Sequence, residues 1–209
     1  MRWYPNIKNS KWCKKYNFRY MGENKMSKIF YNDDLLIKFE SEEQWDESVM
    51  YLSKKLCSCS DDKSILFRLA AQCWYVLTFW DCDIPKERLD RVLFERELEK
   101  TYNIARKKYW NDSDCLWLFG YFMCINQMDF LFVSENLYEV ESEGNRLICE
   151  SYSNDPSNDL AKILYLVDNG TKSKYIAAIK AMRKKINEYF SKQSAVELYF
   201  SEIFTNGIN

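Results

Sequence analysis

Apolar residues recur at helical spacing along most of this 209-residue chain. From residue 41 onward they return every three or four positions with polar residues between them, which is typical of amphipathic helices. Capping residues at the starts of these segments, and Asn-Gly or Gly after the ends of others, mark their boundaries. The pattern predicts helices over residues 41–56, 61–80, 83–110, 113–125, 134–152, 157–170, 172–190 and 194–204.

Two of the predicted helices are apolar on nearly every side, so we expect them at the centre of the fold. In the helix over 61–80, Arg68 and Gln72 lie one turn apart and form the single stripe predicted to face water. In the helix over 113–125, Gly120 would allow a neighbouring helix to approach closely, because it has no Cβ atom. The remaining helices have a polar face and would pack around these two.

The sequence therefore predicts an all-α fold, either a multi-helix bundle or a short, degenerate TPR-like helical array. The array is suggested by Trp117 to Pro156, which has a Gly-containing helix, a second helix and then a turn. We assign one domain, 1–209, with a basic aromatic N-terminal arm over 1–40 and a helical body over 41–209. Residues 28–39 form two β-prone pieces around Asn32 and Asp33, which predicts a small hairpin within the arm.

The most apolar stretch, Cys115 to Val133, is long enough to raise the question of a membrane span. A span needs about 20 predominantly apolar residues, and here Asn126, Gln127 and Asp129 interrupt the run. The N-terminus has no apolar signal segment, and several of the 8 cysteines lie in apolar helical runs. We therefore predict no membrane span, free thiols and a cytoplasmic location.

The residues needed for most catalytic sites are missing. The chain has no His, which excludes Ser-His-Asp and Cys-His arrangements and His-containing zinc sites. It has 5 Gly and no Gly-rich phosphate-binding motif. Cys57 and Cys59 form an isolated pair, which we interpret as part of a helix end. The sequence predicts no enzyme, no metal and no cofactor.

Charge is segregated along the chain although the net charge is −1. Residues 129–159 contain eight acids and one base, interleaved with aromatic residues. Such a surface suits a basic protein partner, because charges speed encounter and aromatic residues supply binding energy. The alternative is an ordinary solvated helix face. The candidate partner-binding residues are Asp129, Phe132, Glu135, Tyr138, Glu139, Glu141 and Glu143.

A second candidate surface lies in the N-terminal arm, where basic and aromatic residues alternate over 2–20. This composition suits single-stranded nucleic acid, through phosphate contacts and base stacking. The alternative is that the arm neutralises the acidic segment 33–62 of the same chain. The seven basic residues over 171–192 are interpreted as a solvated helix face.

The phrase "SDCLWLFGYFMCINQMDF", an acidic helix and then "SNDPSNDLAKILYL" resemble helical immunity proteins of bacterial polymorphic-toxin and contact-dependent growth-inhibition systems. The resemblance covers residues 112–166, with Gly120-Tyr121-Phe122-Met123 where the family pattern has Gly-Tyr-Met. It implies a non-enzymatic, cytoplasmic protein that binds a cognate toxin domain, such as a basic nuclease, and blocks its active site or substrate access. The alternatives are a nucleic-acid-binding module or a helical protein–protein adaptor.

Overall fold

The computed structural model describes residues 29–80, 84, 89–191 and 193–206. These residues form α-helices and one short 3₁₀ segment, η3, and they contain no β-strand. The elements are α1 (Asp34–Ser41), α2 (Trp45–Ser58), α3 (Lys63–Thr78), α4 (Arg91–Lys108), α5 (Ser113–Ile125), η3 (Gln127–Phe130), α6 (Leu137–Asn154), α7 (Asp159–Asn169), α8 (Lys172–Met182), α9 (Ile186–Tyr189) and α10 (Ala195–Asn206). The predicted all-α multi-helix bundle is confirmed.

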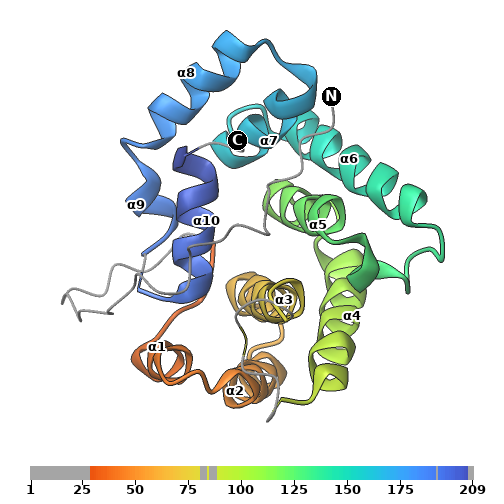
Figure 1. The fold of residues 1–209 in the computed structure, drawn as a ribbon, viewed down its shortest axis with the longest axis vertical. Coiled ribbons are helices and arrows are strands. Elements are labelled where there is room, and N and C mark those ends of the chain that lie inside the picture. The colour runs from red at the N-terminus through yellow and green to blue at the C-terminus, as the bar shows by residue number, and fades with distance from the viewer. Residues whose placement is uncertain (1–28, 81–83, 85–88, 192, 207–209) are drawn as a thin grey trace.

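Helices α3 and α5 lie at the centre, as their apolar sequences predict (Figure 1). Helix α3 packs against α2, α4, α5 and α10, and α5 packs against α3, α6 and α7. Stacked rings join the two central helices, with the centroids of Trp74 and Phe122 4.6 Å apart. Phe200 of α10 packs against the same cluster, 6.3 Å from Trp74. Burial of these large rings removes apolar surface from water and stabilises the fold.

The apolar stretch that begins at Cys115 forms α5 and ends where the polar residues interrupt it. Asp112 caps the helix by accepting hydrogen bonds from the backbone N–H groups of Asp114 and Cys115. Asn126 leaves the helical conformation, with φ −139° and ψ 86°, and η3 follows. Among the described residues, no helix has both the length and the apolar content needed to cross a bilayer.

Gly120 permits a close helix contact, as predicted. It faces Gly144 of α6, and a Cβ atom on either residue would lie 2.8 Å from the carbonyl oxygen of the other. At Gly120, an added Cβ would also lie 2.9 Å from a side-chain carbon of Ile148. The backbones of α5 and α6 therefore meet at this pair, and the pair fixes the position of α6 on the core.

The predicted N-terminal hairpin is wrong, because residues 34–41 form helix α1. Asp33, which we interpreted as a turn residue, is the N-cap: its carboxylate accepts a hydrogen bond from the backbone N–H of Leu36 at 2.9 Å. Leu36 is fully buried against the core. The helical part thus begins within the segment assigned to the arm. Residues 1–28, including the basic aromatic stretch 2–20, lie outside the described residues.

Arg68 and Gln72 do not face water, so this part of the sequence interpretation is also wrong. Both side chains are fully buried. Arg68 forms an ion pair with Glu40 of α1, whose side chain is also buried. The other carboxylate oxygen of Glu40 accepts a hydrogen bond of 2.8 Å from the backbone N–H of Ala195, at the start of α10. This polar contact joins α1, α3 and α10 inside the core.

The helix predicted over 172–190 is interrupted after Met182, and α9 begins at Ile186. At the interruption, the Nε atom of Arg183 donates a hydrogen bond to the carbonyl oxygen of Thr205 at 2.6 Å. The change of direction brings Ile186 and Phe190 into the core. The ring of Phe190 stacks on that of Phe200, with centroids 5.9 Å apart. Packing against α10 therefore overrides the helical period of the sequence.

Candidate protein-binding corner

The chain turns between the central helix α5 and the outer helix α6, and this turn carries all seven candidate partner-binding residues. We call residues 126–143 the corner; it comprises η3, the following turn and the first two turns of α6. It lies at the edge of the molecule, beside α4 (Figure 1).

Hydrogen bonds within the corner hold its backbone in place. The side chain of Asn136 caps α6 by accepting a hydrogen bond from the backbone N–H of Tyr138 at 3.0 Å. The hydroxyl of Ser134 accepts from the backbone N–H of Asn136 at 3.1 Å and donates to the carboxylate of Glu139 at 2.6 Å. At the other end, the side chain of Gln127 donates to the carbonyl oxygen of Cys124 at 2.8 Å. The corner is a defined turn that presents its side chains in fixed positions.

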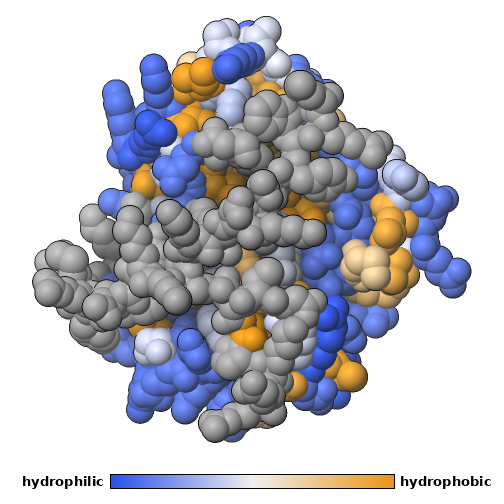
Figure 2. All heavy atoms as spheres, viewed as in Figure 1, coloured by the Kyte–Doolittle hydropathy of each residue, from blue (hydrophilic) through white to orange (hydrophobic). Residues whose placement is uncertain are grey.

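Large apolar side chains are exposed on the corner. Of the nine large hydrophobic residues exposed in the described part of the chain, five lie between residues 128 and 138: Met128, Leu131, Phe132, Leu137 and Tyr138. Of the five in the corner, the most exposed are Tyr138, at 71%, and Met128, at 58%. Figure 2 shows hydrophobic atoms gathered at this edge of the molecule. Single exposed apolar residues are common on protein surfaces, whereas a cluster of them marks an interaction site.

Aromatic packing supports the exposed residues from below. Phe130 is fully buried, and its ring centroid lies 5.5 Å from that of Phe132. Phe132 also packs against Tyr102 of α4, with ring centroids 5.4 Å apart. Phe132 is therefore partly exposed yet fixed from two sides. A fixed aromatic ring at a surface loses little conformational freedom on binding, which favours affinity.

Asp129 lies under the corner and not on its surface. Its side chain is 1% exposed. It accepts a hydrogen bond of 2.6 Å from the side chain of Asn126 and lies 3.7 Å from the guanidinium of Arg91 on α4. Burial raises the pKa of Asp129 to about 7, because the nearby Arg91 offsets only part of the cost of removing the carboxylate from water. Asp129 is thus unavailable for direct contact with a partner.

Acidic side chains surround the exposed apolar residues. Glu135 and Glu139 are exposed and Glu141 is partly exposed. Within the described ranges none of the three forms an ion pair. Glu143 differs, because it accepts two hydrogen bonds, of 2.7 and 2.8 Å, from the guanidinium of Arg146. The carboxylates of Glu135 and Glu141 therefore have no bonded partner within the described residues, and the carboxylate of Glu139 is bonded only to the neutral hydroxyl of Ser134, so all three can still meet basic groups of another molecule.

The structure brings six of the seven predicted residues to the surface of the corner, and it adds three that the sequence interpretation missed. The missed residues are Met128, Leu131 and Leu137, whose apolar side chains are all exposed. The sequence did contain a signal for them. Large apolar residues continue beyond the polar break at Asn126, where the chain leaves the helix and can no longer bury them on one helical face. The contact role of these residues stays a prediction.

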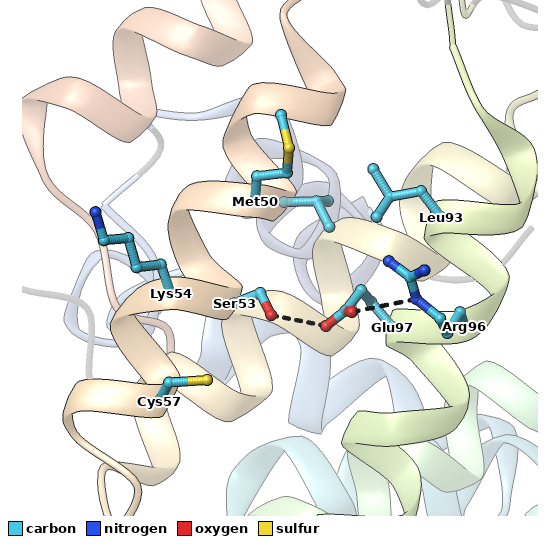
Figure 3. Close-up of a pocket in the computed structure, with 8 residues that line it drawn as sticks. Met50, Ser53, Lys54, Cys57, Leu93, Arg96 and Glu97 are labelled. Atoms are coloured by element: carbon cyan, nitrogen blue, oxygen red, sulfur yellow. Dashed lines mark hydrogen bonds and ion pairs between the residues drawn. The ribbon is translucent and has the colours of Figure 1, made fainter.

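A hollow lies between α2 and α4, away from the corner, with a volume of about 210 Å³ (Figure 3). Three of its polar residues bond one another: the hydroxyl of Ser53 donates to the carboxylate of Glu97 at 2.8 Å, and the guanidinium of Arg96 lies 3.6 Å from the same carboxylate. Ligand pockets are usually larger, about 300–1,000 Å³, and have convergent polar groups free to bind. This groove has the character of ordinary helix packing.

Two features of the described residues bear on catalysis. They contain no group of three or more Cys, Asp or Glu side chains placed to hold a metal ion. Burial raises the pKa of the thiols of Cys73, Cys115 and Cys124, so these groups remain protonated and are poor nucleophiles. The exposed apolar corner with its acidic surround therefore stands out as the candidate functional site.

Comparisons with protein-family models, with curated proteins and with solved structures found no match to this chain.

Proposed function

We propose that this protein is a non-enzymatic immunity protein that binds a cognate bacterial toxin domain through the corner. The observation that supports the proposal best is the cluster of Met128, Leu131, Phe132, Leu137 and Tyr138, exposed at a rigid turn and surrounded by unpaired acids. The resemblance of residues 112–166 to immunity proteins supports the same function. The protein would act in the cytoplasm of the cell it protects.

The chemistry of the corner favours a partner that is basic around an apolar centre. Glu135, Glu139 and Glu141 would attract basic groups and speed the first encounter. Tyr138 and Phe132 would supply most of the affinity, since aromatic residues at the centre of an interface commonly contribute about 2 kcal/mol or more each. Nucleases that hold a nucleic acid substrate present basic surfaces of this kind. A basic nuclease domain is therefore the partner we propose.

Inhibition would follow from occupancy alone. A toxin whose basic substrate-binding surface is covered by the corner cannot bind its substrate, so no reaction by the inhibitor is required. The alternative function, nucleic-acid binding by residues 2–20, involves no residue of the corner. Substitutions in the corner should therefore weaken toxin binding and leave nucleic-acid binding unchanged.

The test first asks whether the gene next to that of this protein encodes a toxin domain, and it then uses that domain. We expect the two proteins to co-purify, and expression of this protein to protect cells from that toxin. Met128→Ser and the charge reversal Glu135→Lys/Glu141→Lys should each weaken protection. The matched controls are Met50→Ser, which removes an equally exposed Met of α2, and Glu42→Lys/Glu47→Lys, which reverses two exposed acids near α2.

Three outcomes bear on the proposal. Loss of protection with the corner variants but not with the controls supports it. Co-purification that is equally weakened by the control variants would show that the corner is not the docking surface. Failure to co-purify, together with failure to protect, would exclude the function itself.

A further inference from the structure

Helix α8 carries basic residues in an arrangement that differs from the rest of the described chain. Six basic residues lie between Lys172 and Lys185, with no acid among them. On other helices, the basic residues near an acid form ion pairs, such as Lys63 with Asp112 and Arg146 with Glu143. On α8 and the turn after it, Lys172, Lys174, Lys180 and Lys184 have no such partner. We call these four residues the lysine ridge.

The fold directs the lysine ridge outward. Ile179 and Met182 are buried on the inner face of α8, which packs against α7 and α10. All four lysines of the ridge are exposed, and so are Ala177 and Ala181 between them. Helix α8 forms the edge of the molecule, far from the corner (Figure 1). Ten residues of helical rise separate Lys172 from Met182, which corresponds to about 15 Å, and Lys184 lies in the turn beyond the end of α8.

The side chains of the ridge favour one kind of anionic partner. A membrane surface requires an apolar face that can enter the lipid. On α8 the large apolar residues Ile179 and Met182 are buried in the fold, and Ile176 is a single exposed apolar side chain, at 40%. Protein interfaces depend on aromatic residues or Arg, but Arg183 of this region already donates to the carbonyl oxygen of Thr205. Single-stranded nucleic acid requires exposed rings for base stacking, and Tyr175 is only partly exposed.

A duplex phosphate backbone requires none of these features. Lysines bind phosphates as point charges, without reading the base sequence. The small exposed side chains of Ala177 and Ala181 would leave room for a broad surface between the lysines. A helix of about 15 Å spans several phosphates, since B-DNA carries a phosphate about every 3.4 Å along each strand.

We propose that the lysine ridge on α8 binds the phosphate backbone of double-stranded nucleic acid, independently of base sequence. This activity is separate from toxin binding, because it uses the opposite edge of the molecule. The contact would be weak, with a dissociation constant of about 10⁻⁴ to 10⁻⁶ M at physiological salt, and it would be tighter at low salt.

The test measures binding of the full-length protein to a fluorescent 20-base-pair DNA duplex by anisotropy over a range of salt concentrations. Each lysine that neutralises a phosphate contributes about −0.9 to the slope of log K against log salt. Replacing all four, as Lys172→Gln/Lys174→Gln/Lys180→Gln/Lys184→Gln, should make the slope shallower by about 3 to 4. An unrelated duplex sequence should give the same result.

Two matched variants each remove four lysines from another region. One is Lys38→Gln/Lys54→Gln/Lys107→Gln/Lys108→Gln, and the other is Lys8→Gln/Lys11→Gln/Lys14→Gln/Lys15→Gln in the N-terminal segment. The proposal holds if the salt dependence of duplex binding becomes shallower in the ridge variant alone, with its circular dichroism spectrum unchanged. It is overturned if the N-terminal variant loses the slope and the ridge variant keeps it. It is equally overturned if the protein binds phosphatidylserine vesicles at low salt but no duplex.

Discussion

At the scale of single residues, buried charge shows most clearly how this fold departs from a simple reading of its sequence. Asp129 and Arg68 are both buried charged residues, and their surroundings differ. Arg68 has a carboxylate partner in Glu40. Asp129 has a neutral hydrogen-bond donor in Asn126 and a more distant cation in Arg91, 3.7 Å away. The ionised form of Asp129 is therefore poorly compensated, whereas Arg68 is paired.

Asp129 should make stability fall as the pH rises toward neutrality. Its native pKa of about 7 exceeds the ordinary value of 3.8. Between these values the native state holds a proton that the unfolded state has lost, so the free energy of unfolding decreases from about pH 4 to pH 7. A shift of this size corresponds to roughly 4 kcal/mol.

Urea unfolding at pH 5.5 and at pH 8 measures this effect. Because Asn carries no charge, Asp129→Asn should be more stable than the wild type at pH 8, and the difference should shrink at pH 5.5. The exposed Asp168, replaced by Asn, serves as the control and should show no such trend. A wild type and an Asp129→Asn variant with parallel pH profiles would contradict this account.

At the scale of elements, the contact between α5 and α6 determines where the corner lies. Gly120 and Gly144 bring the two helices together, with each glycine facing the carbonyl oxygen of the other. Helix α6 begins at Leu137, directly after the exposed turn. Any change in the packing of α6 on α5 would therefore move the residues we propose as contacts.

Replacing either glycine with Ala should destabilise the protein. In an unconstrained helix, Gly to Ala stabilises by about 1 kcal/mol. Here the added Cβ of Gly120→Ala would lie 2.8 Å from a backbone oxygen. Overpacking of this kind costs about 1–3 kcal/mol, so the helices must separate. Chemical denaturation of Gly120→Ala and Gly144→Ala tests this expectation, with Ser142→Ala as an exposed control on α6. A stabilised Gly120→Ala variant would show that the contact is looser than described.

At the scale of the whole molecule, the buried pair of Arg68 and Glu40 connects the two ends of the described chain. Arg68 lies on the central helix α3, Glu40 lies on α1, and Glu40 also accepts the hydrogen bond from Ala195 at the start of α10. The Nε and Nη1 atoms of Arg68 have no hydrogen-bond partner within the described structure. The pair therefore specifies how the terminal helices dock more than it adds net stability.

Removing one charge of this pair should lower the free energy of unfolding strongly, and removing both charges should lower it less. Arg68→Met leaves the carboxylate of Glu40 buried without its cation, which costs about 3–5 kcal/mol. Arg68→Met/Glu40→Gln removes both charges and retains an acceptor for the N–H of Ala195, so it should recover part of that loss. Thermal unfolding of the single and double variants measures the difference. Additive losses would indicate that the two side chains are not coupled.

Much of this architecture could be predicted from the sequence, and the exceptions have physical causes. Helical periodicity predicted the central helices, and Gly120 predicted a close contact, because both depend on local spacing. Asp33 was misinterpreted because a capping Asp and a turn Asp look alike in sequence. Arg68 was misplaced because its polarity indicates water, while its burial depends on Glu40, 28 positions away.

In the candidate site, too, part of the surface could be predicted from the sequence and part could not. The acids of the corner were evident from charge alone, whereas Met128, Leu131 and Leu137 were not selected. Whether an apolar residue in a turn faces inward or outward depends on the neighbouring helices, and no local pattern records it. The structure therefore changes the predicted acidic face into an apolar corner with an acidic surround.

The central claim is that this corner is the docking surface for a toxin domain. Calorimetric titration of the full-length protein with a candidate toxin domain, identified in a gene next to its own, tests it most directly. We predict nanomolar affinity for the wild type, and a loss of at least about 30-fold, or 2 kcal/mol, for Tyr138→Ala. Met50→Ser should bind as the wild type does. Equal affinities for the wild type and Tyr138→Ala, or no binding by the wild type, would contradict the claim.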